Sequence, residues 1–131
     1  RVIMTANAPI FGINTAGNVE TWNRKTEDIS GYSIEEAMGK PLVATFISEA
    51  WRQNVEAVLQ KALHGTYTAN YEFPLFTKHG RRRVILLNAT TRRGADGEVT
   101  GVIGVGQDIT DLRQAMHEFE SAAETWRGFI E

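Results

Sequence analysis

The side chains that could carry out chemistry are few in this chain of 131 residues, and they are dispersed along it. The absence of cysteine excludes thiol nucleophiles, disulfides, iron–sulfur clusters and cysteine-ligated zinc. His64, His79 and His117 show no metal-ligand spacing. The glycines of residues 101–106 lack the G-x-G-x-x-G order of phosphate-binding loops, and no nucleophile, base and oxyanion donor stand in a catalytic pattern. We therefore expect a segment that is not an enzyme and holds no metal.

The composition restricts the partners of the chain. Its 14 basic and 16 acidic residues give a formal net charge of -2, whereas nucleic-acid-binding proteins usually carry a basic excess, so we expect no nucleic-acid partner. No apolar run approaches the roughly 20 residues that cross a bilayer, and we expect a cytoplasmic protein without direct membrane contact. Two arginine clusters, residues 81–83 and 92–93, bracket one predicted strand. A solvated sheet end explains them most simply; an acidic partner or a bound anion is the alternative.

The first part of the chain is predicted to form a hairpin followed by short helices. Residues 10–22 contain two β-tending runs separated by Ala16-Gly17-Asn18, a sequence typical of tight turns. A polar helical pattern occupies residues 23–30. Ser33 and Glu36 then have the spacing of a capping box, which predicts the start of the next helix.

A longer amphipathic helix is predicted from Ser48, which can cap it, to Gly65. Its apolar residues recur at i, i+4, i+7, i+8, i+11 and i+12 and therefore share one face. They are Trp51, Val55, Val58, Leu59, Ala62 and Leu63. We expect this face to pack against a sheet.

Three strands follow without a helix between them, over residues 69–75, 82–91 and 99–107. Pro74 predicts that the first of these lies at a sheet edge, where a missing N–H is tolerated. Residues 84–87 are apolar at every position, which favours a second strand covered on both faces. Hairpins that flank the helices in this way indicate an α+β fold with an antiparallel sheet.

The last segment has a heptad pattern. Its apolar positions alternate in steps of three and four and are Ile109, Leu112, Met116, Phe119, Ala123, Trp126 and Ile130. We call these positions the seam. An average spacing of 3.5 residues favours a helix that pairs with a second copy of the chain. The alternative is a helix that folds back over the outer face of its own sheet.

Five motifs occur along the chain in a fixed order. They are Asn7-Ala8-Pro9, Gly17-Asn18-Val19, Trp22-Asn23, the run from Gly31-Tyr32-Ser33 through Glu35-Glu36 to Gly39-Lys40, and Gly104-Val105-Gly106-Gln107-Asp108-Ile109-Thr110. Together they resemble the PAS family of sensory domains over about residues 7–111, and they are most similar to the PAS repeats of phytochromes and of sensor and hybrid histidine kinases. The resemblance implies a five-stranded antiparallel sheet in the order 2-1-5-4-3, with helices on one face and a signalling helix after the last strand.

The resemblance also implies an interior in which a ligand can sit. Nine residues are candidates for lining it: Tyr32, Phe46, Trp51, Val55, Leu59, Tyr71, Phe73, Leu86 and Asn88. A filled core is favoured over a ligand cavity, because such side chains ordinarily pack against one another. Asn88 would favour a polar pocket if it were buried, since a buried amide needs partners.

PAS domains that bind flavin or haem are alternatives. The adduct-forming cysteine of the light-sensing flavin type would follow Gly39-Lys40, but Pro41-Leu42-Val43 stands there, so no thiol adduct is possible. Haem sensors place a histidine in the long helix, and residues 51–63 contain none. We expect no tightly bound cofactor, and the identity of any ligand stays open.

These observations predict a sensory and signal-relay module. The resemblance assigns the junction between the last strand and the helix to Gln107, Asp108, Ile109 and Thr110. We expect residues 1–6 to end a flanking segment, residues 7–109 to form the PAS domain and residues 110–131 to form a signalling coiled-coil helix. Because the chain starts at Arg1 and stops within a helical pattern, we expect a fragment of a larger protein. The resemblance implies a histidine kinase or a related multidomain signalling protein, with its effector in the same chain. The expected partner is a second copy, bound through the helix, with the sheet as a candidate second contact. A ligand-free dimerisation adaptor is the alternative function.

Overall fold

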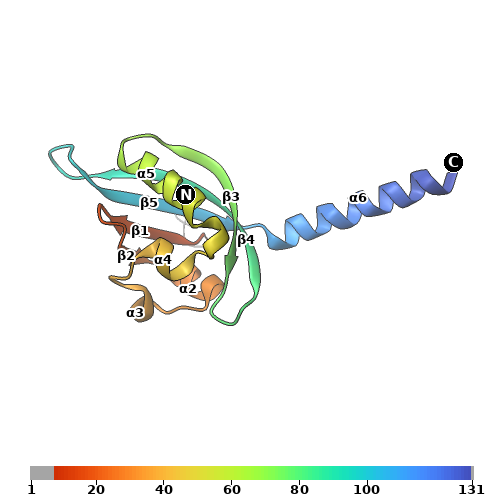
Figure 1. The fold of residues 1–131 in the computed structure, drawn as a ribbon, viewed down its shortest axis with the longest axis horizontal. Helices are drawn as coiled ribbons and strands as arrows, with labels where there is room; N and C mark the ends of the chain where they lie inside the picture. Colours follow the sequence, from red (N-terminus) through yellow and green to blue (C-terminus); the bar gives the residue numbers. More distant parts are fainter. Residues whose placement is uncertain (1–7, 131) are drawn as a thin grey trace.

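The computed structural model describes residues 8–130, which form a curved sheet with short helices on one face and a long helix that leaves it (Figure 1). The prediction for residues 1–6 lies outside the described part of the chain. In sequence order the elements are β1 (Ile10–Asn14), β2 (Val19–Trp22), α2 (Arg24–Ser30), α3 (Ile34–Ala37), α4 (Leu42–Phe46), the 3-10 helix η1 (Glu49–Trp51), α5 (Arg52–Leu63), β3 (Thr68–Phe76), β4 (Arg82–Arg93), β5 (Val99–Asp108) and α6 (Thr110–Ile130).

The sheet confirms the predicted fold class. Its five strands lie in the order β2-β1-β5-β4-β3, and each neighbouring pair is antiparallel. β3 lies at an edge, as Pro74 predicts, and Pro74 stands opposite Val84 of β4. Because β1 pairs with β5, the first and last strands meet at the centre of the sheet. The end of β5 is therefore tied to the interior of the domain.

Local signals fix the first helices. Asn23 caps α2 by accepting a hydrogen bond from the backbone N–H of Thr26 at 3.0 Å. Gly31 ends the helix with φ of 80°, a left-handed conformation that favours glycine. Ser33 and Glu36 form the predicted capping box of α3. These caps place α2 and α3 directly after the β1–β2 hairpin.

Helix α5 packs on the sheet through the apolar face that the sequence predicts. Val55, Leu59 and Ala62 are buried, and they join the core formed by the inward side chains of the strands. The predicted start is wrong in detail, because Ser48 precedes a 3-10 turn and its hydroxyl caps no helix. Trp51 belongs to that turn, and its ring meets Tyr71 of β3 edge-on at 6.4 Å. The predicted direction of Trp51 towards the sheet is nevertheless correct.

The last helix projects away from the domain (Figure 1). Only its first turns contact the sheet, through β4 and through an ion pair between Arg113 and Glu72 of β3. The alternative in which this helix folds back over the outer face of the sheet is therefore not the arrangement observed. Among the described residues, no helix has both the length and the apolar character needed to cross a membrane.

Candidate functional site

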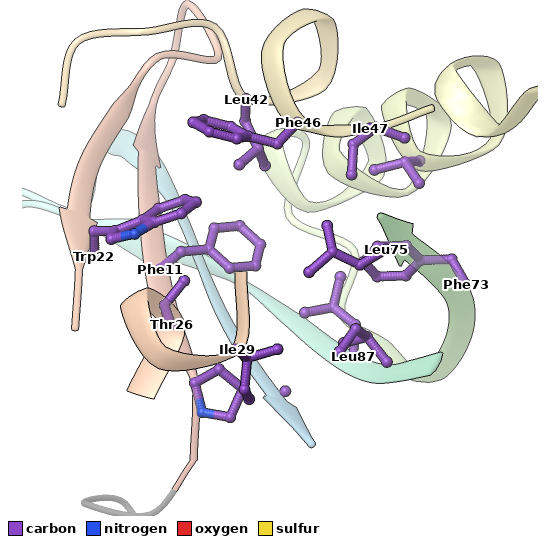
Figure 2. A pocket seen from close by; sticks show the side chains of 14 residues that line it. Phe11, Trp22, Thr26, Ile29, Leu42, Phe46, Ile47, Phe73, Leu75 and Leu87 are labelled. Atoms are coloured by element: carbon purple, nitrogen blue, oxygen red, sulfur yellow. The ribbon is translucent and has the colours of Figure 1, made fainter. Parts of the chain in front are cut away.

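A small cavity lies between the sheet and the helices (Figure 2). Its volume is about 60 Å³. Side chains from both ends of the sheet and from three helices line it, and the labelled ones in Figure 2 are Phe11, Trp22, Thr26, Ile29, Leu42, Phe46, Ile47, Phe73, Leu75 and Leu87. Small-molecule sites usually enclose about 300–1,000 Å³. The interior is thus close to a filled core, which is the favoured sequence prediction.

The polar groups at the cavity wall already have partners. The indole N–H of Trp22 donates to the backbone carbonyl of Tyr32 at 3.0 Å. The hydroxyl of Thr26 donates to the backbone carbonyl of Ile10 at 3.0 Å. The other lining side chains are apolar, so the cavity offers little to a polar ligand. A void of this kind stays dry and accepts only a small apolar molecule.

Seven of the nine candidate residues pack in or around this interior. Phe46, Val55 and Phe73 line the cavity directly. Leu59 is buried beside it, and the ring of Tyr32 meets Phe46 edge-on at 5.0 Å. Trp51 and Tyr71 are half-buried and pack against the edge of the core.

The other two candidates, Leu86 and Asn88, point away from the cavity, and this part of the prediction is wrong. They alternate along β4 with Ile85 and Leu87, which line it. Asn88 is half-buried on the outer face, and its side-chain oxygen accepts the backbone N–H of Asn70 at 3.1 Å. The amide of Asn88 therefore does not mark a polar pocket.

Sequence reasoning missed the side of the cavity formed by β1. The ring of Phe11 lies over Gly104 of β5, where an added Cβ would come within 2.4 Å of ring carbons. The glycines of β5 are the sequence signal for this close approach, since they leave space for a large side chain. The sequence alone does not show which side chain packs over these glycines, because that depends on the pairing of β1 with β5.

Six neighbouring contacts fix the junction between β5 and α6, and four of them reach β4. Arg83 donates through Nε to Oδ2 of Asp108 at 2.8 Å, and its Nη2 lies 2.7 Å from the same oxygen. The other oxygen of Asp108 accepts the backbone N–H of Thr110 at 3.0 Å and also its hydroxyl. In turn, the Thr110 hydroxyl accepts the backbone N–H of Val84 at 2.8 Å, and the N–H of Ile109 donates to the carbonyl of Val84 at 2.8 Å. We call this set of contacts the junction clamp.

The junction clamp favours the ionised form of Asp108. Partial burial of the carboxyl raises its pKa, but hydrogen bonds from Thr110 and the charge and hydrogen bond of Arg83 outweigh that effect. The net result is a pKa of Asp108 below the ordinary value of an aspartate. Gln107, by contrast, is exposed at the end of β5.

The lowered pKa predicts a pH-dependent contribution to stability. Because the pKa of Asp108 is lower in the folded chain than in the unfolded chain, its stabilising effect is present above about pH 4 and disappears as the pH falls through the folded pKa. We expect Asp108→Asn to lower the free energy of unfolding at neutral pH, and the difference from wild type to shrink on acidification. Denaturant unfolding of both proteins between about pH 7 and about pH 3 measures this.

Asp96 provides the control, since it is exposed in the β4–β5 turn and no hydrogen bond of its carboxylate is found within residues 8–130. Asp96→Asn should leave the unfolding free energy close to wild type at neutral pH. A difference between wild type and Asp108→Asn that stayed constant with pH would contradict the assigned pKa.

The seam is exposed along the projecting part of α6. Leu112, Met116, Phe119 and Trp126 are large apolar side chains at the surface, and Phe119 is 74% exposed. Ala123 is half-buried, Ile109 is buried at the junction, and the side chain of Ile130 lies outside the described ones. Exposed apolar side chains in a stripe on a projecting helix are typical of an interaction surface.

A family model supplies the decisive comparison. The model of the PAS fold matches residues 1–109, which include the whole sheet and all the helices before α6. The chain belongs to the PAS family. Its five-stranded sheet, its helices on one face and its C-terminal helix are those of a PAS domain.

The relatives of this PAS domain are signalling proteins. Phytochrome B-2 of Glycine max is 35% identical over 134 residues, an alignment that covers 99% of this chain and 12% of the phytochrome. The PAS domain of a Colwellia psychrerythraea protein superposes with a TM-score of 0.71 at 22% identity, over 79% of this chain and 87% of that one. A sensory box histidine kinase/response regulator from Burkholderia thailandensis gives 0.69 at 20% identity, over 96% and 95%. The PAS domain is thus a sensory, regulatory type of domain that occurs within larger signalling proteins.

Proposed function

We propose that this PAS domain relays a conformational signal from its sheet, through the junction clamp, into a coiled-coil helix that leads to an effector, most simply a histidine kinase. In this scheme residues 7–109 are the PAS domain and residues 110–131 the output helix. The kinase context is supported by the fold shared with the Burkholderia thailandensis sensory box histidine kinase/response regulator. The chain spans about an eighth of the length of the soybean phytochrome, so an effector would lie elsewhere in the polypeptide.

The junction clamp is the observation that carries the proposal. Arg83 and Val84 belong to β4, whereas Asp108 and Thr110 stand at the two sides of the β5–α6 boundary. A shift of β4 against β5 therefore moves the first turn of α6 directly. The hydrogen bonds between Arg83 and Asp108 are charged, and such bonds are stronger and more directional than neutral ones. They therefore hold β4 and the end of β5 in a defined geometry.

Two copies are proposed to pair through the seam. Its large side chains are exposed on the projecting helix, and their burial against a second copy would remove them from water. Three heptads make a marginal coiled coil, so we expect weak association that depends on concentration. The outer face of the sheet, where Val105 is exposed, is the candidate second contact between the copies.

A graft tests the relay. Residues 1–131 replace the sensor domain of a histidine kinase, in register with its coiled coil, and autophosphorylation is measured. We expect Asp108→Ala to change the kinase output several-fold while lowering the midpoint of thermal unfolding by only a few degrees, because the clamp lies outside the core. Asp96→Ala is the control and should leave the output unchanged. Equal output from wild type and Asp108→Ala would contradict the relay.

A ligand-free dimerisation adaptor is the second candidate, and the small apolar cavity favours it. The two functions differ in whether a small molecule occupies the domain. Native mass spectrometry of the purified chain, compared with its denatured mass, separates them. A bound molecule supports a ligand-driven sensor. The adaptor is supported if the native mass equals that of the chain alone and if Asp108→Ala leaves the kinase output of the graft unchanged.

A further inference from the structure

A second hollow lies on the surface beside the junction, and it is larger than the interior cavity. Its volume is about 380 Å³, within the range of about 300–1,000 Å³ typical of small-molecule sites. One wall is α2, which contributes Lys25 and Asp28. The other wall is the turn between β3 and β4, which contributes His79 and Arg81, and the junction pair Arg83 and Asp108 also lines the hollow. We call this hollow the junction groove.

The two walls of the junction groove are tied together. The backbone N–H of Lys78 donates to the carbonyl of Ser30 at the end of α2, at 2.9 Å. Within the turn, the N–H of Thr77 donates to the carbonyl of Arg81 at 2.8 Å, and the N–H of Arg81 donates back to the hydroxyl of Thr77 at 3.1 Å. The groove is therefore built on hydrogen-bonded backbone, and a ligand would need little rearrangement to enter it.

The charges of the junction groove are unbalanced towards the positive. Asp108 is paired with Arg83, and Asp28 lies 3.5 Å from Arg24 on its own helix. Lys25 and Arg81 have no acidic partner within residues 8–130. The nearby ammonium of Lys78 is directed to Glu36 on α3. Three cationic and two acidic side chains thus line the groove, a formal excess of one positive charge, and the two cations without an ion pair, Lys25 and Arg81, stand on its two walls.

We propose that the junction groove binds a small multivalent oxyanion, such as a phosphate compound or a polycarboxylate. Lys25 supplies an ammonium from one wall and Arg81 a guanidinium from the other. Arg83 uses Nε and Nη2 on Asp108, so its Nη1 can donate to an anion in the groove. Guanidinium and ammonium groups together suit an oxyanion that has several acceptor oxygens.

This location gives the anion access to the junction. A bound anion would accept a hydrogen bond from the Arg83 guanidinium, which also holds Asp108, so it would weaken the junction clamp or redirect it. The effect on the output helix rests on the proposed relay function, whereas the binding itself does not. Arg81 and Arg83 then serve as more than a solvated sheet end.

Titration followed by NMR tests the proposal. Pyrophosphate, citrate and sodium chloride at matched ionic strength are added separately to the ¹⁵N-labelled chain at neutral pH. We expect saturable shifts of the amides of Gly31 and residues 77–81 and of the Arg83 Nε–H signal with pyrophosphate, with citrate, or with both, and none that saturate with chloride. The comparison of pyrophosphate with citrate identifies whether a phosphate compound or a polycarboxylate is the better ligand.

Matched variants locate the site. Lys25→Ala with Arg81→Ala should weaken the apparent affinity at least about tenfold, since charged hydrogen bonds are lost. Arg82→Ala is the control, because Arg82 is an exposed neighbouring cation that does not line the groove, and it should leave the affinity within about twofold. Shifts that do not saturate, or that persist in the double variant, would overturn the proposal. If binding saturates but the anion does not change the kinase output of the graft, the binding site is supported and only its link to the relay is overturned.

Discussion

Replacement of Leu59 by alanine is expected to lower the free energy of unfolding by about 2–5 kcal/mol. Leu59 is 2% exposed and lies on the face of α5 that packs against the sheet, together with Val55 and Ala62. The truncation removes buried methyl groups and leaves a void that the surrounding strands fill only in part. Denaturant unfolding followed by circular dichroism measures the loss.

Two companion variants make this test specific. Gln53→Ala changes an exposed position of the same helix, so it should cost less than about 0.5 kcal/mol. Leu59→Met keeps the volume of the side chain and should cost less than about 1.5 kcal/mol. A loss below about 0.5 kcal/mol for Leu59→Ala would show that the packing of α5 is assigned wrongly.

Lysine at Met116 and Phe119 is expected to convert a concentration-dependent dimer into a monomer. These seam residues are 44% and 74% exposed on the projecting helix, so the burial that stabilises a dimer must come from a second copy. The two lysines place like charges in the interface while preserving helix propensity. Sedimentation equilibrium of residues 1–131 over a range of concentrations measures the association.

The matched control places lysine at Ser121 and Thr125, which are exposed and lie outside the seam. This variant has the same added charge and should dimerise like wild type. A wild-type chain that stays monomeric at every concentration would contradict pairing through the seam. So would a dimer that the Met116→Lys, Phe119→Lys double variant leaves intact.

The elements that local patterns predict well are those with caps or long periodicity. Ser33 with Glu36, Gly31 and the apolar face of α5 each depend on residues a few positions apart, and the structure confirms all three. α4 is harder to predict, because it spans only Leu42–Phe46 and has no side-chain cap. A helix this short shows no periodicity, and contacts with other elements stabilise it.

The errors in the predicted pocket arise from β4. Residues 84–87 are apolar at every position, so alternation could not say which side chains point inward. The structure explains the pattern: Ile85 and Leu87 face the cavity, while Val84 is buried where its backbone meets the junction clamp. The sequence pattern does not reveal that long-range contact, and for the same reason the prediction places Leu86 on the wrong face of the strand.

The junction, in contrast, was predicted by resemblance and its physical basis comes from the structure. Asp108 and Thr110 are adjacent to the boundary in any reading of the sequence, but their partners Arg83 and Val84 lie 25 and 26 residues away. We infer that these contacts form a local clamp between an intact core and an output helix.

Amide hydrogen exchange in Thr110→Val tests this claim most directly. Valine keeps the shape of threonine but removes the hydroxyl that accepts the N–H of Val84 and donates to Asp108. We predict at least about tenfold faster exchange at the amides of Val84, Ile109 and Arg113, with unchanged protection in the paired centres of β1 and β5. Unchanged exchange at the junction, or an equal increase throughout the sheet, would contradict the account.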